Sequence, residues 1–167
     1  MRPGVRLGID VGEVRVGVAT SDPDGILATP VRTVPCAGAD PTPTDPDIVT
    51  LIELTDALGV VEVVVGWPLL LSGAEGSSAL RARRYAEVLA TEIAPIGVRL
   101  VDERFTSVDA HRGLRESGFA GRRQRAVVDQ AAAVLILQGA LDAERGSGRP
   151  VGQEVGRHGR RKPRAKG

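Results

Sequence analysis

The sequence predicts an α/β protein with one mixed five-stranded sheet, its first three strands antiparallel and helices on both faces. Two observations support this fold class. Runs rich in Val and Ile at residues 5–12 and 14–20 meet at a tight turn over Gly12 and Glu13, as in a β-hairpin. The nearly continuous valine run at residues 60–65 is typical of a parallel strand covered on both faces. With 167 residues, of which 42% are hydrophobic, the chain can form one domain with a proper core.

The remaining elements follow from periodicity and punctuation. Residues 25–34 read as a third, edge-like strand that tolerates Pro30, and five prolines or glycines break residues 35–46 into a loop. Asp45 then suits the N-cap of a helix with Pro46 in its first position. We expect strands at 5–12, 14–20, 25–34, 60–65 and 98–104, and helices at 46–58, 78–93, 106–117 and 126–144.

Charge is unevenly distributed along the chain. The formal net charge is +1, but residues 146–167 hold seven basic residues against one acidic residue. We therefore expect a domain at 1–145 and a basic tail at 146–167 without regular structure. A mildly acidic body with a basic tail suits a protein that meets a polyanion through local patches. Because aromatic residues make up only 2% of the chain, base stacking is not expected to dominate nucleic-acid binding.

Composition also limits the metal chemistry and the location. Cys36 is the single cysteine, so an internal disulfide and a thiolate zinc site are excluded. A bound metal would be held by oxygen ligands, which points to Mg²⁺ or Mn²⁺. No run of eighteen apolar residues and no apolar signal segment is present, so we expect a cytoplasmic protein with no membrane partner.

Three carboxylates are candidates for a shared site. Asp10 lies late in the first strand, Glu103 directly after the last strand, and Asp129 in the first turn of the final helix. Because ligands of such sheets collect at the carboxyl ends of the strands, these acids can converge on one edge. One or two Mg²⁺ ions would offset their repulsion and could support phosphodiester displacement. Taken singly, each has a more ordinary role: Asp10 could end a strand, Glu103 could be a surface charge, and Asp129 could favour the helix dipole.

The chain resembles the YqgF/RuvX family of Holliday junction resolvases, also described as pre-16S rRNA nucleases, which has an RNase H-like fold. The resemblance covers residues 5 to about 143, and its pieces are specific only as an ordered set. They are Leu7-Gly8-Ile9-Asp10-Val11-Gly12, Arg15-Val16-Gly17-Val18-Ala19, Ser21-Asp22, Val64-Val65-Gly66-Trp67-Pro68, Ser72-Gly73, Asp102-Glu103-Arg104, Thr106-Ser107 and Val128-Asp129-Gln130-Ala131-Ala132.

This resemblance implies roles for individual residues. Asp10, Glu103 and Asp129 would be the catalytic, metal-binding acids. Arg15 and Arg104 match motif arginines that would hold substrate phosphate, and we assign the same role to the basic cluster before the final helix, Arg122, Arg123 and Arg125. The chain departs from the family where Val14 replaces a frequent Lys, and its basic tail lies outside the common pattern.

The predicted function is that of an Mg²⁺- or Mn²⁺-dependent endonuclease acting on structured nucleic acid. The resemblance leaves two substrates open, the 5′ end of precursor 16S rRNA and a Holliday junction, and two symmetric cuts in a junction would need a homodimer. One alternative is a non-catalytic module that binds structured RNA or DNA, or a ribosome-assembly factor with the same fold. Another is an ATP-binding protein of the actin and sugar-kinase class, although such folds need two domains.

Overall fold

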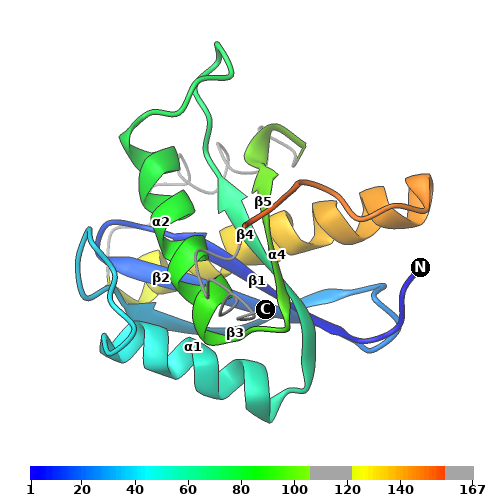
Figure 1. The fold of residues 1–167 in the computed structure, drawn as a ribbon, viewed down its shortest axis with the longest axis horizontal. Helices are drawn as coiled ribbons and strands as arrows, with labels where there is room; N and C mark the ends of the chain where they lie inside the picture. Colours follow the sequence, from blue (N-terminus) through cyan, green and yellow to red (C-terminus); the bar gives the residue numbers. More distant parts are fainter. Residues whose placement is uncertain (106–121, 157–167) are drawn as a thin grey trace, which may run out of the picture.

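The computed structural model describes residues 1–105 and 122–156, with the backbone alone for Phe105 and residues 122–127. It contains one sheet with strand order β3-β2-β1-β4-β5-β6 (Figure 1). The strands are β1 (Val5–Val11), β2 (Arg15–Ser21), β3 (Ala28–Pro35), β4 (Val60–Trp67), β5 (Gly97–Asp102) and β6 (Gln153–Glu154). The helices are α1 (Pro46–Ala57), α2 (Ser77–Glu92), the short 3-10 helix η1 (Glu103–Phe105) and α4 (Arg122–Ser147).

The strand directions follow the predicted mixed arrangement. β1, β2 and β3 are antiparallel neighbours, whereas β4 pairs in parallel with β1 and β5 pairs in parallel with β4. The tight turn and the valine run therefore identified the two kinds of pairing correctly. The helix expected at 106–117 lies outside the described residues.

The sheet has six strands, so the expectation of five is wrong. β6 is antiparallel to β5, with Leu100 opposite Gln153 and Arg99 opposite Glu154. Val155, directly after β6, is buried in the main core. α4 also continues to Ser147, so residues 146–156 are not the irregular tail that was expected, whereas residues 157–167 lie outside the described residues. A two-residue strand has no periodicity to detect, and it forms because β5 offers an unpaired edge.

Helices cover both faces of the sheet, as predicted. On one face, alternate residues of β1 and β4 pack with α1 and α2, as Leu7, Ile48 and Tyr85 illustrate. On the other face, α4 packs on residues of β2, β4 and β5 through side chains such as Ile136 and Leu137. Figure 1 shows α1 and α2 on the near side of the sheet and α4 on the far side. Within the described part of the chain, no helix has the length and apolar character needed to span a bilayer.

Three glycines let α4 lie directly on the strands. A Cβ built at Gly17 would lie 2.1 Å from the carbonyl oxygen of Asp129, and one built at Gly8 would lie 2.6 Å from Cβ of Leu137. A Cβ at Gly66 would meet Ile136 at 2.5 Å. Side chains at these positions would overlap α4, so glycine on β2, β1 and β4 sets the height of the helix above the sheet.

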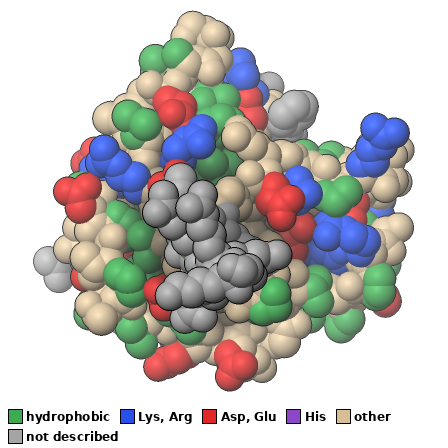
Figure 2. All heavy atoms as spheres, in the orientation of Figure 1, with side chains coloured by type: hydrophobic (Ala, Val, Ile, Leu, Met, Phe, Trp, Pro, Cys, Tyr) green, Lys and Arg blue, Asp and Glu red, His purple; other side chains and the backbone are tan. Residues whose placement is uncertain are grey.

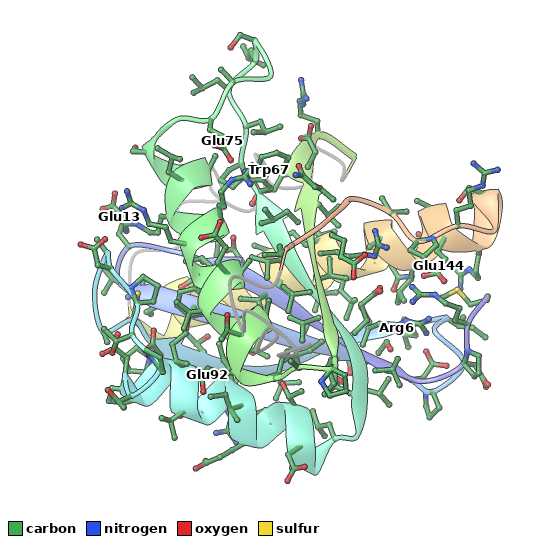
Figure 3. All side chains as sticks on the ribbon, viewed as in Figure 1. Arg6, Glu13, Trp67, Glu75, Glu92 and Glu144 are labelled. Atoms are coloured by element: carbon green, nitrogen blue, oxygen red, sulfur yellow. The ribbon has the colours of Figure 1, made fainter. Side chains whose placement is uncertain are left out.

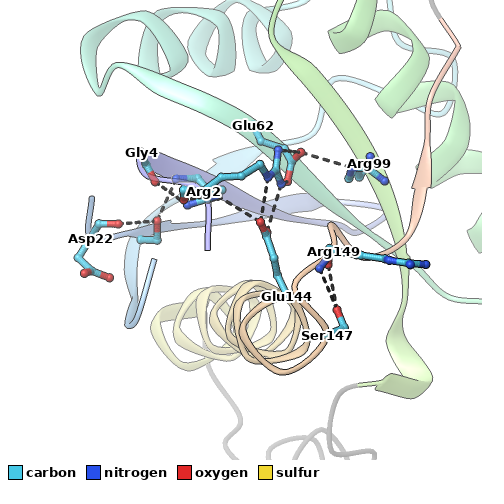
Figure 4. Close-up of polar contacts among 10 residues, drawn as sticks. Arg2, Gly4, Asp22, Glu62, Arg99, Glu144, Ser147 and Arg149 are labelled. Atoms are coloured by element: carbon cyan, nitrogen blue, oxygen red, sulfur yellow. Dashed lines mark hydrogen bonds and ion pairs between the residues drawn. The ribbon is translucent and has the colours of Figure 1, made fainter. Parts of the chain in front are cut away.

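A cluster of ion pairs fixes the other end of α4. Arg2 donates to Glu144 of α4 at 2.8 Å and to Glu62 of β4 at 3.0 Å, and Arg99 of β5 donates to Glu62 at 3.3 Å (Figure 4). The hydrogen bonds from Arg2 lower the pKa of Glu144 below its usual value. The cluster therefore connects the N-terminal segment, the sheet and α4 while these carboxylates are ionised.

Candidate functional site

Asp10 lies on the α4 face of the sheet. Side chains alternate along β1, with Leu7 and Ile9 in the core beneath α1 and α2 and Gly8 against Leu137 of α4. Asp10 has the same orientation as Gly8 and is half-buried. Its partner across the hairpin is Gly17, the residue over which α4 passes. The strand pattern therefore places this carboxylate beside the first described turns of α4.

Glu103 approaches the same region from the other side of β4. It begins η1 directly after β5, and its Oε1 lies 3.0 Å from the position that a Cβ at residue 66 would occupy. Ile9 pairs with Val65, so the next residues of these strands, Asp10 and Gly66, come level with each other. Asp10 and Glu103 thus lie on the two sides of Gly66, and Ile136 occupies the position that a side chain at residue 66 would take, with its Cδ1 2.5 Å from it.

Asp129 lies over the same face, but its carboxylate is paired with an arginine. Its backbone carbonyl packs on Gly17, the hairpin partner of Asp10. Its Oδ2 accepts a 2.8 Å hydrogen bond from Nε of Arg15, at the start of β2. Both side chains are about a quarter exposed, so water and solutes can reach the pair. The helix therefore carries Asp129 to the predicted edge, with its charge balanced by Arg15.

A divalent cation requires several oxygen donors close together. Among the described side chains, no group of three or more His, Cys, Asp or Glu residues is arranged to hold a metal ion. Mg²⁺, however, is commonly bound by one or two carboxylates together with waters and substrate phosphates. Asp10 and Glu103 fit that demand, because both are carboxylates and both lie beside Gly66 on the same region of the sheet. Asp129 could join them with the carboxylate oxygen that does not accept from Arg15, or with both oxygens after leaving Arg15.

The other predicted phosphate-binding arginines have different surroundings. Arg104 is exposed and donates to Asp102 from Nε at 2.7 Å and from its backbone N–H at 2.9 Å. Burial raises the pKa of Asp102, but the hydrogen bonds from Arg104 outweigh burial and the net shift is downward. Sequence reasoning used Asp102 only as part of a motif and missed this pairing, although acid and base two residues apart at a strand end are a recognisable signal. The predicted residues Arg122, Arg123 and Arg125 begin α4, and their side chains lie outside the described part.

Charge on the visible surface is mixed. Figure 2 shows Lys and Arg side chains in separate groups with Asp and Glu between them, and the described part of this face has no continuous basic area. This view looks onto α1 and α2, so the face that it shows is the one opposite to α4.

The fold defines a class of protein, an α/β protein of the RNase H-like fold. A solved structure, "T. thermophilus RuvC in complex with Holliday junction substrate", matches with a TM-score of 0.51 and 16% identity, over 89% of this chain and 99% of that chain. This similarity establishes the fold.

Sequence comparison identifies the family. Residues 4–143 match the family model described as "RuvX: Holliday junction resolvase", and the chain belongs to this family. A protein of Streptomyces coelicolor named "Putative pre-16S rRNA nuclease" is 54% identical over 93% of this chain and 90% of its own length. A relative of the same name from Kineococcus radiotolerans is 50% identical over 100% of this chain and 87% of its own length. The resemblance found from the motifs is confirmed.

Proposed function

We propose that this protein is a metal-dependent endonuclease that hydrolyses phosphodiester bonds in structured nucleic acid. The observation that supports this function best is the placement of Asp10 and Glu103 on one face, on the two sides of Gly66. Membership of the RuvX family supports a nucleic-acid substrate. We also propose a cytoplasmic location, because a protein that cleaves cellular RNA or DNA must meet its substrate there.

Asp10 and Glu103 would hold the cation, and Asp129 would complete the set. When bound, Mg²⁺ or Mn²⁺ supplies positive charge that stabilises the attacking and leaving oxygens of the phosphodiester. The protein's own contribution is orientation: β1 and η1 fix two carboxylates, and α4 carries the third on a helix pressed against Gly17.

Arg15 has two possible anionic partners in this scheme. In the free protein its guanidinium donates to Asp129. A substrate phosphate is a comparable acceptor for a guanidinium, and a cation at the site would compete for the Asp129 carboxylate. We infer that substrate binding moves Arg15 from Asp129 to phosphate, which frees the third acid where it is needed. Arg104, released from Asp102, would provide a second phosphate contact.

The substrate that we favour is the 5′ end of precursor 16S rRNA. Relatives with about half of their residues identical to this chain carry a name that refers to this RNA. A four-way DNA junction is the second candidate, because the family description and the RuvC complex refer to it. Junction resolution would in addition require a homodimer, since two strands must be cut symmetrically.

Cleavage assays on both substrates test this proposal. Purified protein is incubated with a precursor 16S rRNA fragment or a four-way junction, in Mg²⁺, Mn²⁺ or EDTA. We expect metal-dependent cuts that Asp10→Asn and Glu103→Gln abolish, with unchanged thermal unfolding. Asp56→Asn is the matched control, because this acid is exposed on α1 at the opposite face. Full cleavage by Asp10→Asn would show that the nuclease site lies elsewhere.

One observation favours a second function, that of a non-catalytic binding module or ribosome-assembly factor. The Asp129 carboxylate already has a cationic partner in Arg15, so its charge is balanced by a residue of the chain itself. Binding of the same RNA in EDTA, with no cleavage in either metal, would support this alternative.

A further inference from the structure

The segment between β4 and α2 forms an ordered hairpin that projects from the sheet, at the top of Figure 1. Leu70 N–H donates to the carbonyl of Ala74 at 2.9 Å, and Gly73 N–H donates to the carbonyl of Leu70 at 2.8 Å. Gly73 has φ of +84°, which glycine adopts without strain. These bonds describe a three-residue hairpin loop with glycine in its left-handed position. Leu71 and Ser72 are therefore held at the tip by backbone geometry.

The base of this hairpin is tied to both neighbouring elements. The carboxylate of Glu75 accepts a 3.1 Å hydrogen bond from Nε1 of Trp67, at the end of β4, and a second bond from Nε of Arg83 on α2. The guanidinium of Arg83 also lies 5.1 Å from the centre of the Trp67 ring. Figure 3 shows Glu75 directed toward Trp67. The hairpin thus has a fixed direction as well as a fixed tip.

The tip carries an apolar side chain that has no protein contact to bury it. Leu71 is 98% exposed and Leu70 is 53% exposed. An exposed leucine forgoes the favourable free energy that burial of its side chain would provide. Asn, Asp or Ser at this turn position would expose a polar side chain to water instead of an apolar one. The residue type at the tip therefore suits contact with another molecule.

The hairpin stands beside the candidate site. It begins directly after Trp67, the last residue of β4, which pairs with Asp102, and the preceding residue, Gly66, lies next to Glu103. Leu71 is five positions after Gly66 in the chain, so the two lie within about 17 Å of each other. Stacked bases are about 3.4 Å apart, so the tip can reach a base within about five nucleotides of a phosphate at the acids.

We propose that Leu71 is a wedge that packs between bases of the substrate where their stacking is interrupted, within about five nucleotides of the cut. This inference rests on the proposed nuclease function and specifies its substrate class: nucleic acid with a junction, bulge or helix end near the scissile bond. Apolar side chains on rigid elements commonly enter base steps in this way and partly unstack them.

A second copy of this chain is a poorer occupant of the tip. A stable protein interface buries about 800 Å² on each partner. The hairpin offers Leu71 and part of Leu70, with the small or polar residues Ser72, Gly73 and Ala74 around them. One leucine on a narrow tip matches the gap between two bases better than it matches a flat protein surface.

Fluorescence of 2-aminopurine tests the wedge without any need for cleavage. The base analogue is placed singly at each of the five nucleotides on either side of the expected cut, in a four-way junction and in a precursor rRNA fragment. Binding of wild-type protein in EDTA should raise the fluorescence at one position, because the analogue brightens when it unstacks. Leu71→Ala should lose this rise and weaken binding about tenfold, the effect of about 1.4 kcal/mol. Leu27→Ala is the matched control, since Leu27 is 58% exposed in a different loop.

Two results would overturn the wedge. One is binding by wild-type protein without a rise at any position, and the other is an equal rise with Leu71→Ala. A protein mass that halves in Leu71→Ala, measured by sedimentation, would assign the tip to a second copy instead. Asp10→Asn separates this inference from the nuclease proposal: it should keep the fluorescence rise and lose cleavage. If the rise is seen and no cleavage occurs in any metal, the wedge stands and the nuclease proposal fails.

Discussion

Replacement of Gly17 by alanine tests whether β2 sets the position of Asp129. The added Cβ would lie 2.1 Å from the Asp129 carbonyl oxygen and 3.2 Å from the backbone nitrogen of Gln130. Ordinary contacts of a Cβ begin at 3.4 Å, so the helix backbone must retreat by about 1.3 Å, the difference between these two distances. Because the obstacle is backbone, no side-chain rotation can relieve it. The first described turns of α4 must therefore move.

Two effects of this displacement can be estimated. Overpacking of a well-packed core costs about 1–3 kcal/mol, so the free energy of unfolding should fall by that amount. A displacement of about 1 Å in a catalytic group can reduce turnover about 100-fold. The Asp129 carboxylate moves with its helix, so both its bond to Arg15 and its relation to Asp10 should change.

Urea unfolding and the cleavage rate on precursor rRNA measure the two effects in parallel. Gly97→Ala is the matched control, because Gly97 also lies in a strand and a Cβ there has open space around it. This control should keep wild-type stability to within about 0.5 kcal/mol. If Gly17→Ala unfolds and cleaves like Gly97→Ala, the close contact between β2 and α4 does not position Asp129.

Three further outcomes follow from the charged groups. The hydrogen bond from Arg2 lowers the pKa of Glu144 from its usual 4.5. The pair therefore stabilises the fold above that pH, and this stabilisation is lost as the pH falls through the lowered pKa. Glu144→Gln should thus make the fall of Tm below about pH 4.5 less steep. Arg15→Gln frees Asp129, so calorimetry should show tighter Mn²⁺ binding, and filter binding in EDTA should show weaker RNA binding; unchanged values for both would contradict the exchange. Deletion of residues 157–167 removes six basic residues, so the plot of log Kd against log salt concentration should become shallower while turnover is retained. Complete loss of cleavage would instead place this segment in the site.

The elements that the sequence predicted correctly are those with local signals. A tight turn between two Val- and Ile-rich runs specified the β1–β2 hairpin, and the valine run specified a parallel strand covered on both faces. β6 was missed because two residues carry no period. The helix expected at 126–144 extends from Arg122 to Ser147, and it ends at Gly148, whose φ of +71° and N–H bond to the carbonyl of Glu144 are those of a glycine helix stop.

The sequence by itself determined which residue types could form a site: three carboxylates at strand and helix ends, with oxygen as the available metal ligand. Only the tertiary structure decided how they are arranged. Gly66 lets Glu103 approach the sheet beside Asp10, and Gly17 lets α4 bring Asp129 over the same face. There the guanidinium of Arg15 pairs with the Asp129 carboxylate. Periodicity depends on neighbours within a few residues of the chain, whereas these contacts join residues up to 114 positions apart through helix packing.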